Sequence, residues 1–381
     1  MFIENTLKAN KKLIETAITL HQTGKILPDS YVIDVDQLMQ NAKIMLKTAQ
    51  ENKIRLFFML KQLGRNPYLA KKLVELGYPG AVVVDYNEAK MMMKHQIPIV
   101  HVGHLVQPPF ALIDELVHYG IEYFTVYSLE KIKDIHFCAQ KRGKVQKIIL
   151  RVVGDGDMMY SGQTAGFMLN QLVDLVEQVK TLEYIQISGV TAFPCFLYDN
   201  EKIEPTSNLK TVLAAKGILE NCGINCDEIN IPSSTCCYTL PAIAQAGGTS
   251  GEPGHGLSGT TPLHAHCDQP EKPCVVYVSE ISHTFQKESY CYGGGFYRRG
   301  HMTHALIGKS IDTLKKTQVI TPNHDSIDYH FGLAGLFDVN LTVVMAFRFQ
   351  IFVTRSTVVL LEGLQSEKPS IQSYTALGEL L

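Results

Sequence analysis

The sequence predicts an α/β protein in which a (β/α)8 TIM-type barrel is followed by a C-terminal antiparallel β domain. Apolar strand-like runs alternate with helical patterns over most of the chain, and this alternation stops near residue 271. β-branched runs without clear intervening helices then follow. We expect an N-terminal helical segment over 1–27, the barrel over 28–271 and the β domain over 272–381. A doubly wound open sheet is the alternative to the barrel.

The barrel is expected from about eight successive units of a strand-like run, most of them followed by a helical pattern. Parallel strands joined by helical crossovers close most economically into a barrel, in which the residues after the strands converge on one mouth. The expected strands are Tyr31–Val35, Leu56–Leu60, Ala81–Val84, Ile99–Val102, Tyr123–Val126, Lys147–Val153, Ile187–Val190 and Glu228–Ile231.

The β domain is expected from β-branched and aromatic runs that follow Pro270–Pro273, such as Val275–Val278, Thr342–Phe347 and Ser356–Leu361. Turns separate these runs, which is typical of antiparallel strands.

Composition agrees with a globular protein of two domains, because the 381 residues are 45% hydrophobic and 19% charged. A net charge of -2 argues against nucleic-acid and anionic-membrane partners. No apolar run approaches the roughly 20 residues needed to cross a bilayer, and no basic-then-apolar leader is recognisable, so a cytoplasmic location is expected. The nine cysteines, an odd number, are expected to be reduced, buried thiols rather than a disulfide framework.

Lys61 directly follows the apolar run Leu56–Leu60 and precedes a turn. Desolvation at the end of a buried strand disfavours the ammonium form, and the neutral amine can attack a carbonyl to form a Schiff base. Lys61 is therefore a candidate cofactor anchor. A solvated lysine at a strand end is the alternative.

The segment Gly251–Gly259 places glycines and a proline around one carboxylate, Glu252, and one imidazole, His255. Such a loop lets backbone N–H groups approach an anion closely. Together with Lys61, the segment resembles the phosphate- and pyridine-binding part of the alanine racemase-like family of fold type III pyridoxal phosphate (PLP) enzymes. The resemblance extends along nearly the whole chain and is closest to the YhfX-type branch of predicted amino-acid racemases.

The resemblance implies that PLP is the cofactor and that Lys61 carries it as a Schiff base. Glu252 stands where alanine racemases have an arginine and related barrel decarboxylases have a glutamate. A carboxylate beside the pyridine nitrogen favours its protonated form, which makes the ring a strong electron sink. A solvated turn glutamate is the alternative interpretation of Glu252.

The resemblance assigns phosphate binding to Gly254 and His255 together with the cluster Ser233–Thr235, in which Ser234 matches the family position best. Ser234 is also a candidate N-cap for a helix over 238–246. Arg65 is a candidate contact for phosphate or carboxylate. Of the serine cluster, we count Ser233, Ser234 and Thr235 as cofactor-binding residues.

Two positions depart from the family pattern. Phe193 matches a cofactor-binding phenylalanine, but Ala192 replaces the histidine that often precedes it and stacks on the pyridine ring. Thr164 stands where racemases have an arginine in the loop after strand six, so no function is assigned to Thr164.

Tyr292, which precedes glycines in the expected β domain, resembles the catalytic tyrosine of racemases. In that family the tyrosine enters from the partner subunit, so the resemblance implies a homodimer with shared active sites. A core or hairpin tyrosine is the alternative. The pairs His264 and His266, and His301 and His304, match no well-defined zinc signature, and no metal is expected.

These features predict a PLP-dependent amino-acid racemase or epimerase that removes the Cα proton of a small-molecule amino acid. The alternatives are a PLP-dependent D-amino-acid lyase, aldolase or decarboxylase, and a non-catalytic PLP carrier protein. The sequence does not indicate which amino acid is the substrate, because pocket shape depends on long-range packing.

Overall fold

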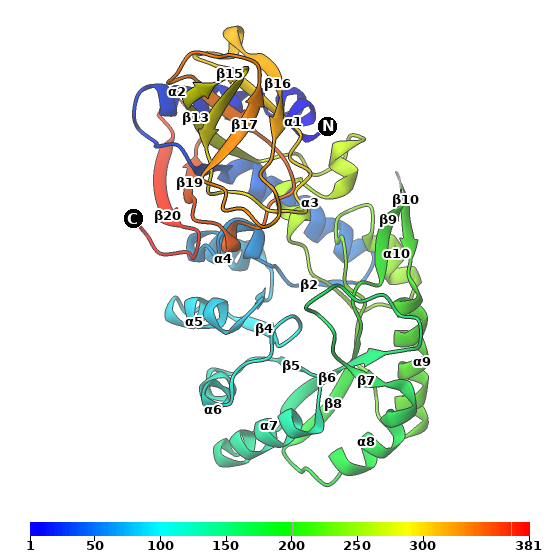
Figure 1. Cartoon of the computed structure of the whole chain (residues 1–381). Helices are drawn as coiled ribbons and strands as arrows, with labels where there is room; N and C mark the ends of the chain where they lie inside the picture. The colour runs from blue at the N-terminus through cyan, green and yellow to red at the C-terminus, as the bar shows by residue number, and fades with distance from the viewer. Residues whose placement is uncertain (200–201, 367) are drawn as a thin grey trace. The chain divides into compact units, whose positions relative to one another are not determined.

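The structure is a computed structural model that describes residues 1–199, 202–366 and 368–381. The chain forms two compact units, each assembled from separate stretches (Figure 1). The antiparallel unit comprises Met1–Ile44, Lys61–Leu69 and Gly254–Leu381, and the barrel unit comprises Met45–Leu60 and Ala70–Pro253. Helices α3 (Val35–Glu51) and α4 (Pro67–Leu76) each run from one unit into the other.

The barrel unit is built on parallel strands in the order β2-β12-β11-β8-β6-β5-β4-β3. A parallel bridge between Phe58 and Ala81 links the two ends of this series. The predicted parallel barrel is therefore confirmed. The strands are β2 (Arg55–Leu56), β3 (Ala81–Val82), β4 (Ile99–Val102), β5 (Tyr123–Val126), β6 (Gln146–Val153), β8 (Ile185–Thr191), β11 (Glu228–Asn230) and β12 (Ser250–Gly251).

Helices alternate with the barrel strands along the chain (Figure 1). Their ends follow ordinary capping chemistry: the Ser128 side chain accepts a hydrogen bond from the Lys131 N–H at the start of α7, and Gly143 ends that helix in the left-handed conformation. The helices are α5 (Tyr86–Lys94), α6 (Phe110–Tyr119), α7 (Leu129–Arg142), α8 (Leu172–Val179), α9 (Ser207–Asn221) and α10 (Leu240–Gln245). Short additions are β7 (Phe167–Met168), η2 (Leu169–Gln171) and the hairpin β9 (Phe196–Asp199) and β10 (Lys202–Pro205).

The antiparallel unit contains a sheet in the order β14-β17-β16-β15-β18-β13-β1-β19-β20. An additional pairing of β14 with β13 closes six of these strands into a small barrel. The strands are β1 (Ser30–Asp34), β13 (Val275–Phe285), β14 (Glu288–Tyr292), β15 (His304–Gly308), β16 (Lys315–Ile320), β17 (His330–Ala334), β18 (Thr342–Met345), β19 (Thr357–Glu362) and β20 (Ser370–Thr375). The predicted antiparallel β domain is confirmed.

The assignment of Tyr31–Val35 to the parallel barrel is wrong. Tyr31–Asp34 lie in β1, which pairs antiparallel with β13 and parallel with β19, and Val35 begins α3. The five residues of β1 are all buried, as the residues of a barrel strand are. The local sequence pattern therefore does not show whether the strand belongs to the parallel barrel or to the antiparallel sheet. That depends on pairing partners far along the chain.

The N-terminal segment expected over 1–27 contains α1 (Phe2–Ala9) and α2 (Lys11–Gln22). Their apolar residues, including Phe2, Leu13 and Ile18, share one core cluster with Val276 of β13 and Val344 of β18. Burial of this apolar helix face against the sheet stabilises both elements. Short turns complete the unit: η1 (Lys61–Leu63), α11 (His255–Ser258), η3 (Pro262–Ala265), η4 (Ile311–Thr313) and η5 (Ile351–Val353).

All nine cysteines are reduced thiols, as expected. The expectation that they are buried is wrong for Cys267, which is exposed, and for Cys222 and Cys226, which are partly buried. Among the described residues, no helix combines the length and apolar character required to traverse a bilayer. Within the same residues, no group of three or more histidine, cysteine, aspartate or glutamate side chains is arranged to hold a metal ion.

Candidate active site

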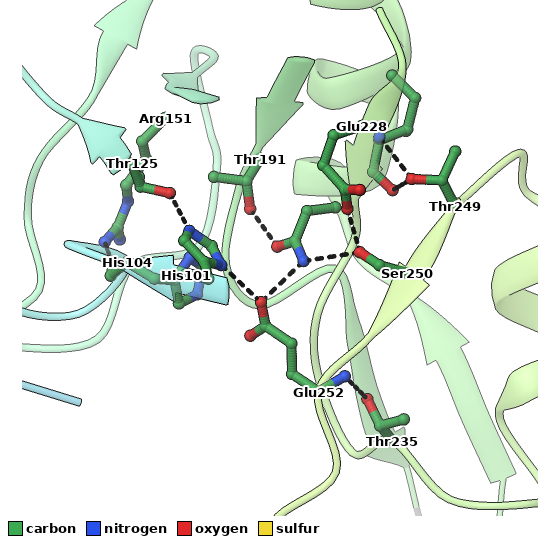
Figure 2. A network of polar contacts seen from close by, with 12 residues as sticks. His101, His104, Thr125, Arg151, Thr191, Glu228, Thr235, Thr249, Ser250 and Glu252 are labelled. Carbon is green, nitrogen blue, oxygen red and sulfur yellow. Dashed lines mark hydrogen bonds and ion pairs between the residues drawn. The ribbon is translucent and has the colours of Figure 1, made fainter. Parts of the chain in front are cut away.

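Polar side chains gather at the carboxyl ends of the barrel strands, around Glu252 (Figure 2). Asn230 is the last residue of β11 and lies in register with Thr191 of β8 and Ser250 of β12. Glu252 follows β12 by one residue. Because parallel strands end at the same edge of a sheet, these side chains meet inside one end of the barrel.

The two oxygens of the Glu252 carboxylate have different environments. Oε1 accepts hydrogen bonds from His101 Nδ1 at 3.0 Å and from Asn230 Nδ2 at 2.9 Å. Among the residues that the structure describes, none makes a hydrogen bond to Oε2. The backbone N–H of Glu252 donates to Thr235 Oγ1 at 3.2 Å. Glu252 is therefore held in one orientation with one oxygen still available to a ligand.

Glu252 is ionised at neutral pH. Burial alone would raise the pKa of its carboxyl, but the charge of His104, the hydrogen bond and charge of His101 and the hydrogen bond from Asn230 outweigh burial and lower the pKa to about 2. The side chain is only 2% exposed. The result is a buried carboxylate, which contradicts the alternative of a solvated turn glutamate.

The groups that hold Glu252 are themselves held. His101 Nε2 is hydrogen-bonded to Thr125 Oγ1, and Thr191 Oγ1 donates to Asn230 Oδ1 at 2.8 Å. Asn230 Nδ2 also donates to Ser250 Oγ at 3.2 Å. Since the Asn230 oxygen accepts and its nitrogen donates, its amide orientation is fixed toward Glu252. Sequence reasoning missed His101 and Asn230, although a polar residue within an apolar strand was a usable signal.

Phe193, a predicted cofactor-binding residue, contacts two other rings. Its ring meets that of His104 edge-on at 5.9 Å between centroids and that of Tyr160 at 5.7 Å. The His104 ring lies 5.4 Å from that of His101. An imidazole thus contacts Phe193 from the loop after β4, although Ala192 supplies none.

The three residues of the serine cluster have different surroundings. Ser233 Oγ donates to the Phe196 carbonyl and accepts from the Phe196 N–H at 3.1 Å, so its hydroxyl is engaged with β9. Thr235 holds the Glu252 backbone. Ser234 has a left-handed backbone with φ of 52°, and no described residue makes a hydrogen bond to its hydroxyl. Of the three, Ser234 has the hydroxyl best able to meet a ligand.

In the antiparallel unit, Lys61 opens η1 and Gln62 lies against Gly254. A Cβ at residue 254 would lie 2.4 Å from Gln62 Oε1, so a larger residue there would require the buried Gln62 side chain to shift. His255 Nε2 donates to the Phe349 carbonyl at 3.0 Å. Burial, then the charges of Arg348 and Lys61, hold the pKa of His255 well below its usual value. His255 is neutral, so it would meet an anion through its backbone N–H.

The two remaining predicted site residues also lie in the antiparallel unit. Arg65 is buried, and its guanidinium carbon lies 5.1 Å from the centre of the Phe352 ring. Tyr292 ends β14 with 40% of its surface exposed, and its ring lies 6.0 Å from that of His330. His264, considered for metal binding, has both ring nitrogens engaged with Thr261 Oγ1 and the Glu271 carbonyl.

Comparison with known proteins agrees with this architecture. The chain matches the family model for the alanine racemase N-terminal domain over residues 33–262, and the model for the YhfX-like C-terminal domain over residues 276–371. It is 45% identical to the uncharacterized protein YhfX of Escherichia coli (strain K12), over 100% of both chains.

Two solved structures have a similar fold at low sequence identity. Alanine racemase of Clostridium difficile 630 is 16% identical, with a TM-score of 0.65 over 92% of this chain and 99% of that one. D-threonine aldolase from Filomicrobium marinum is 13% identical, with a TM-score of 0.63 over 92% of this chain and 95% of that one. The fold is thus shared by enzymes of different reactions.

Proposed function

Because the chain belongs to the alanine racemase-like family of PLP-dependent proteins, we propose that it is an amino-acid racemase or epimerase. One observation carries the proposal: a buried, ionised glutamate, Glu252, has its Oε1 held by His101 and Asn230 and its Oε2 available. Such a carboxylate suits a protonated ring nitrogen, because opposite charges in a dry setting stabilise each other.

The residues present fit PLP. When bound, PLP supplies an electron sink that stabilises negative charge at the substrate Cα. Glu252 would face the pyridine nitrogen, Phe193 would contact the ring, and Lys61 would hold the cofactor covalently. Ser233, Ser234, Thr235, Gly254, His255 and Arg65 would contribute to anchoring the phosphate. Of these, Ser234 is assigned a direct hydroxyl contact, and Gly254 and His255 are assigned contacts through their backbone N–H groups.

Backbone pairing inside the barrel unit supports joint roles for Lys61 and Gly254. The Met59 N–H donates to the Pro253 carbonyl at 3.0 Å, and the Phe57 N–H donates to the Gly251 carbonyl at 2.9 Å. Lys61 follows Met59 by two residues, and Gly254 directly follows Pro253. The chain thus leaves these two paired strands at neighbouring points.

Inversion at Cα requires two proton-carrying groups on opposite faces, since a single base returns the proton to the face it left. We assign Lys61 Nζ to one face and Tyr292 Oη to the other. Tyr292 would act from the partner subunit of a homodimer. Exposed apolar side chains beside it suit a subunit interface: Tyr329 is 67% exposed and Ile327 is 61% exposed, and the Tyr329 carbonyl accepts from the Gly293 N–H.

A lyase, aldolase or decarboxylase is the second candidate. The same Glu252 carboxylate favours it, because a protonated ring stabilises the negative charge at Cα whichever bond is broken. A panel of L- and D-amino acids, followed by chiral chromatography of the products, distinguishes the two. Racemisation yields the mirror-image amino acid with no loss of carbon, whereas the alternatives release a fragment.

The proposal is tested by reducing the purified holoprotein with borohydride and mapping the labelled peptide by mass. We expect the cofactor to be fixed to the peptide that contains Lys61. Treatment of Lys71→Ala, which removes an exposed lysine of α4, should give the same labelled peptide. Labelling of another lysine, or failure of PLP to bind after reconstitution, rejects the proposed function.

A further inference from the structure

Arg151 is a buried cation, and no acidic side chain in the described part of the chain pairs with it. It lies near the carboxyl end of β6, is 2% exposed and is one of the largest fully buried side chains. Its Nη2 donates to the Gln163 carbonyl at 2.8 Å, and its Nη1 donates to the His104 carbonyl at 3.3 Å and to Tyr127 Oη at 3.2 Å. Among the described residues, no carboxylate forms an ion pair with the guanidinium.

These contacts leave the charge of Arg151 unbalanced. An arginine remains protonated at any physiological pH, and a charge removed from water is costly unless an opposite charge compensates it. Two carbonyls and one phenol supply only dipoles. The guanidinium has five N–H donors. It donates three hydrogen bonds to described residues, so N–H groups remain that can bind an anion.

The side chain points into the barrel at the end that carries Glu252. Side chains two residues apart on a strand share a face, and Ile149 belongs to the cluster inside the barrel with Phe57 and Val100. Arg151 is therefore on the interior face, one step nearer the carboxyl end. Figure 2 shows Arg151 beside His104 and Thr125, and Thr125 bonds to the His101 that holds Glu252.

We propose that Arg151 binds the carboxylate of the substrate and makes the protein selective for amino acids with a free α-carboxylate over amines, amides and esters. This inference rests on the proposed function. Glu252 repels an anion, so a carboxylate in the same barrel end requires a cation, and Arg151 is a permanent one. A guanidinium also matches the planar carboxylate geometry, which allows two parallel hydrogen bonds.

A purely structural role is the competing explanation, in which Arg151 only ties the loop at Gln163 to the loop at His104. The two roles differ in what they predict for ligands. A structural tie requires hydrogen bonding but no anion, whereas a carboxylate site distinguishes an acid from its uncharged amide.

The test uses the holoprotein and butyrate, an acid that lacks an amine and cannot join the cofactor. Butyrate affinity is measured by titration calorimetry, with butyramide as the uncharged counterpart. We expect wild type to bind butyrate at least tenfold more tightly than butyramide, and Arg151→Gln to lose at least tenfold in butyrate affinity. Arg151→Lys should retain part of it. Arg142→Gln, which removes an exposed arginine paired with Asp114, is the matched control and should bind as wild type does.

A second measurement requires only wild type and decides the question if Arg151→Gln does not fold. Butyrate affinity is followed from pH 6 to pH 9. A guanidinium keeps its charge over this range, so the affinity should stay constant within about twofold. Affinity that falls as imidazoles lose their protons would assign the anion to a histidine and overturn the inference.

The proposed binding of a carboxylate by Arg151 would also be overturned if wild type binds butyrate and butyramide equally well. Unchanged butyrate affinity in folded Arg151→Gln would overturn it too. Either result with PLP still fixed to Lys61 rejects the role of Arg151 alone. Absence of cofactor on Lys61 rejects the proposed function instead.

Discussion

The two units of the chain hold their candidate functional groups in different ways. In the barrel unit, Glu252, Asn230 and Ser250 are buried and hydrogen-bonded within one network. In the antiparallel unit, Tyr292 is 40% exposed at a strand end and Lys61 opens a short 3-10 turn. Under the proposed function, this difference corresponds to a division of labour: the barrel unit would fix the electrostatics of the reaction, and the antiparallel unit would supply the groups that move protons.

The largest effect is expected when the two proposed proton-carrying groups, Lys61 and Tyr292, are removed one at a time. Lys61→Ala and Tyr292→Phe homodimers should each fail to racemise, since each leaves one face of Cα without a base. Mixing and re-associating the two variants should recover up to about a quarter of wild-type activity, because half of the dimers are mixed and each has one intact site of two.

Absence of recovery despite proven subunit exchange would mean that Tyr292 does not act across subunits. The recovery test has meaning only if both parents are inactive, so each is first assayed alone. Subunit exchange is checked by mass after mixing differently tagged chains.

The next prediction concerns the pH dependence of stability. The folded-state pKa of Glu252 is lowered from 4.5 to about 2, so its ionisation stabilises the fold above pH 4.5, and this contribution is lost as pH falls toward 2. A shift of this size corresponds to about 3 kcal/mol. The free energy of unfolding, measured in urea from pH 6 to pH 3, should fall more steeply for wild type than for Glu252→Gln.

Glu220→Gln, which changes an exposed glutamate of α9, serves as the control and should retain the wild-type slope. Identical slopes for wild type and Glu252→Gln would show that the Glu252 carboxylate is not held by His101 and Asn230 as described.

A smaller effect is expected in the antiparallel unit at Gly254. In Gly254→Ala the new Cβ would lie 2.4 Å from Oε1 of the buried Gln62, which costs about 1 to 3 kcal/mol in a packed interior. We expect PLP affinity to weaken by roughly tenfold, which corresponds to about 1.4 kcal/mol. Adding Gln62→Ala should restore space and affinity, whereas wild-type affinity in Gly254→Ala alone would contradict this packing.

The sequence predicted the fold more fully than the site. Parallel and antiparallel regions were recognisable because helices separate strand-like runs in one part of the chain and not in the other. The sequence did not show that β1 belongs to the antiparallel sheet, because Ile33 pairs with Val275, a residue far along the chain. Pairing over such a distance leaves no local pattern.

The sequence indicates candidate site residues where a residue has an unusual position relative to strands or glycines, as with Lys61 and Glu252. His101, Asn230 and Arg151 were not recognised, because their importance depends on which side chains the closed barrel brings together. A polar residue inside a strand indicates burial with a partner, but the partner appears only in three dimensions.

Under the proposed function, Glu252 keeps the pyridine nitrogen of bound PLP protonated. The most direct test is the ¹⁵N NMR shift of PLP labelled at that nitrogen, measured in wild type and in Glu252→Gln. We predict a protonated nitrogen in wild type and an unprotonated one in the variant, which should retain PLP on Lys61. Cα deprotonation should slow about thirty- to a thousand-fold, corresponding to roughly 2 to 4 kcal/mol. The same protonated shift in both proteins, with equal rates of Cα deprotonation, would contradict the claim.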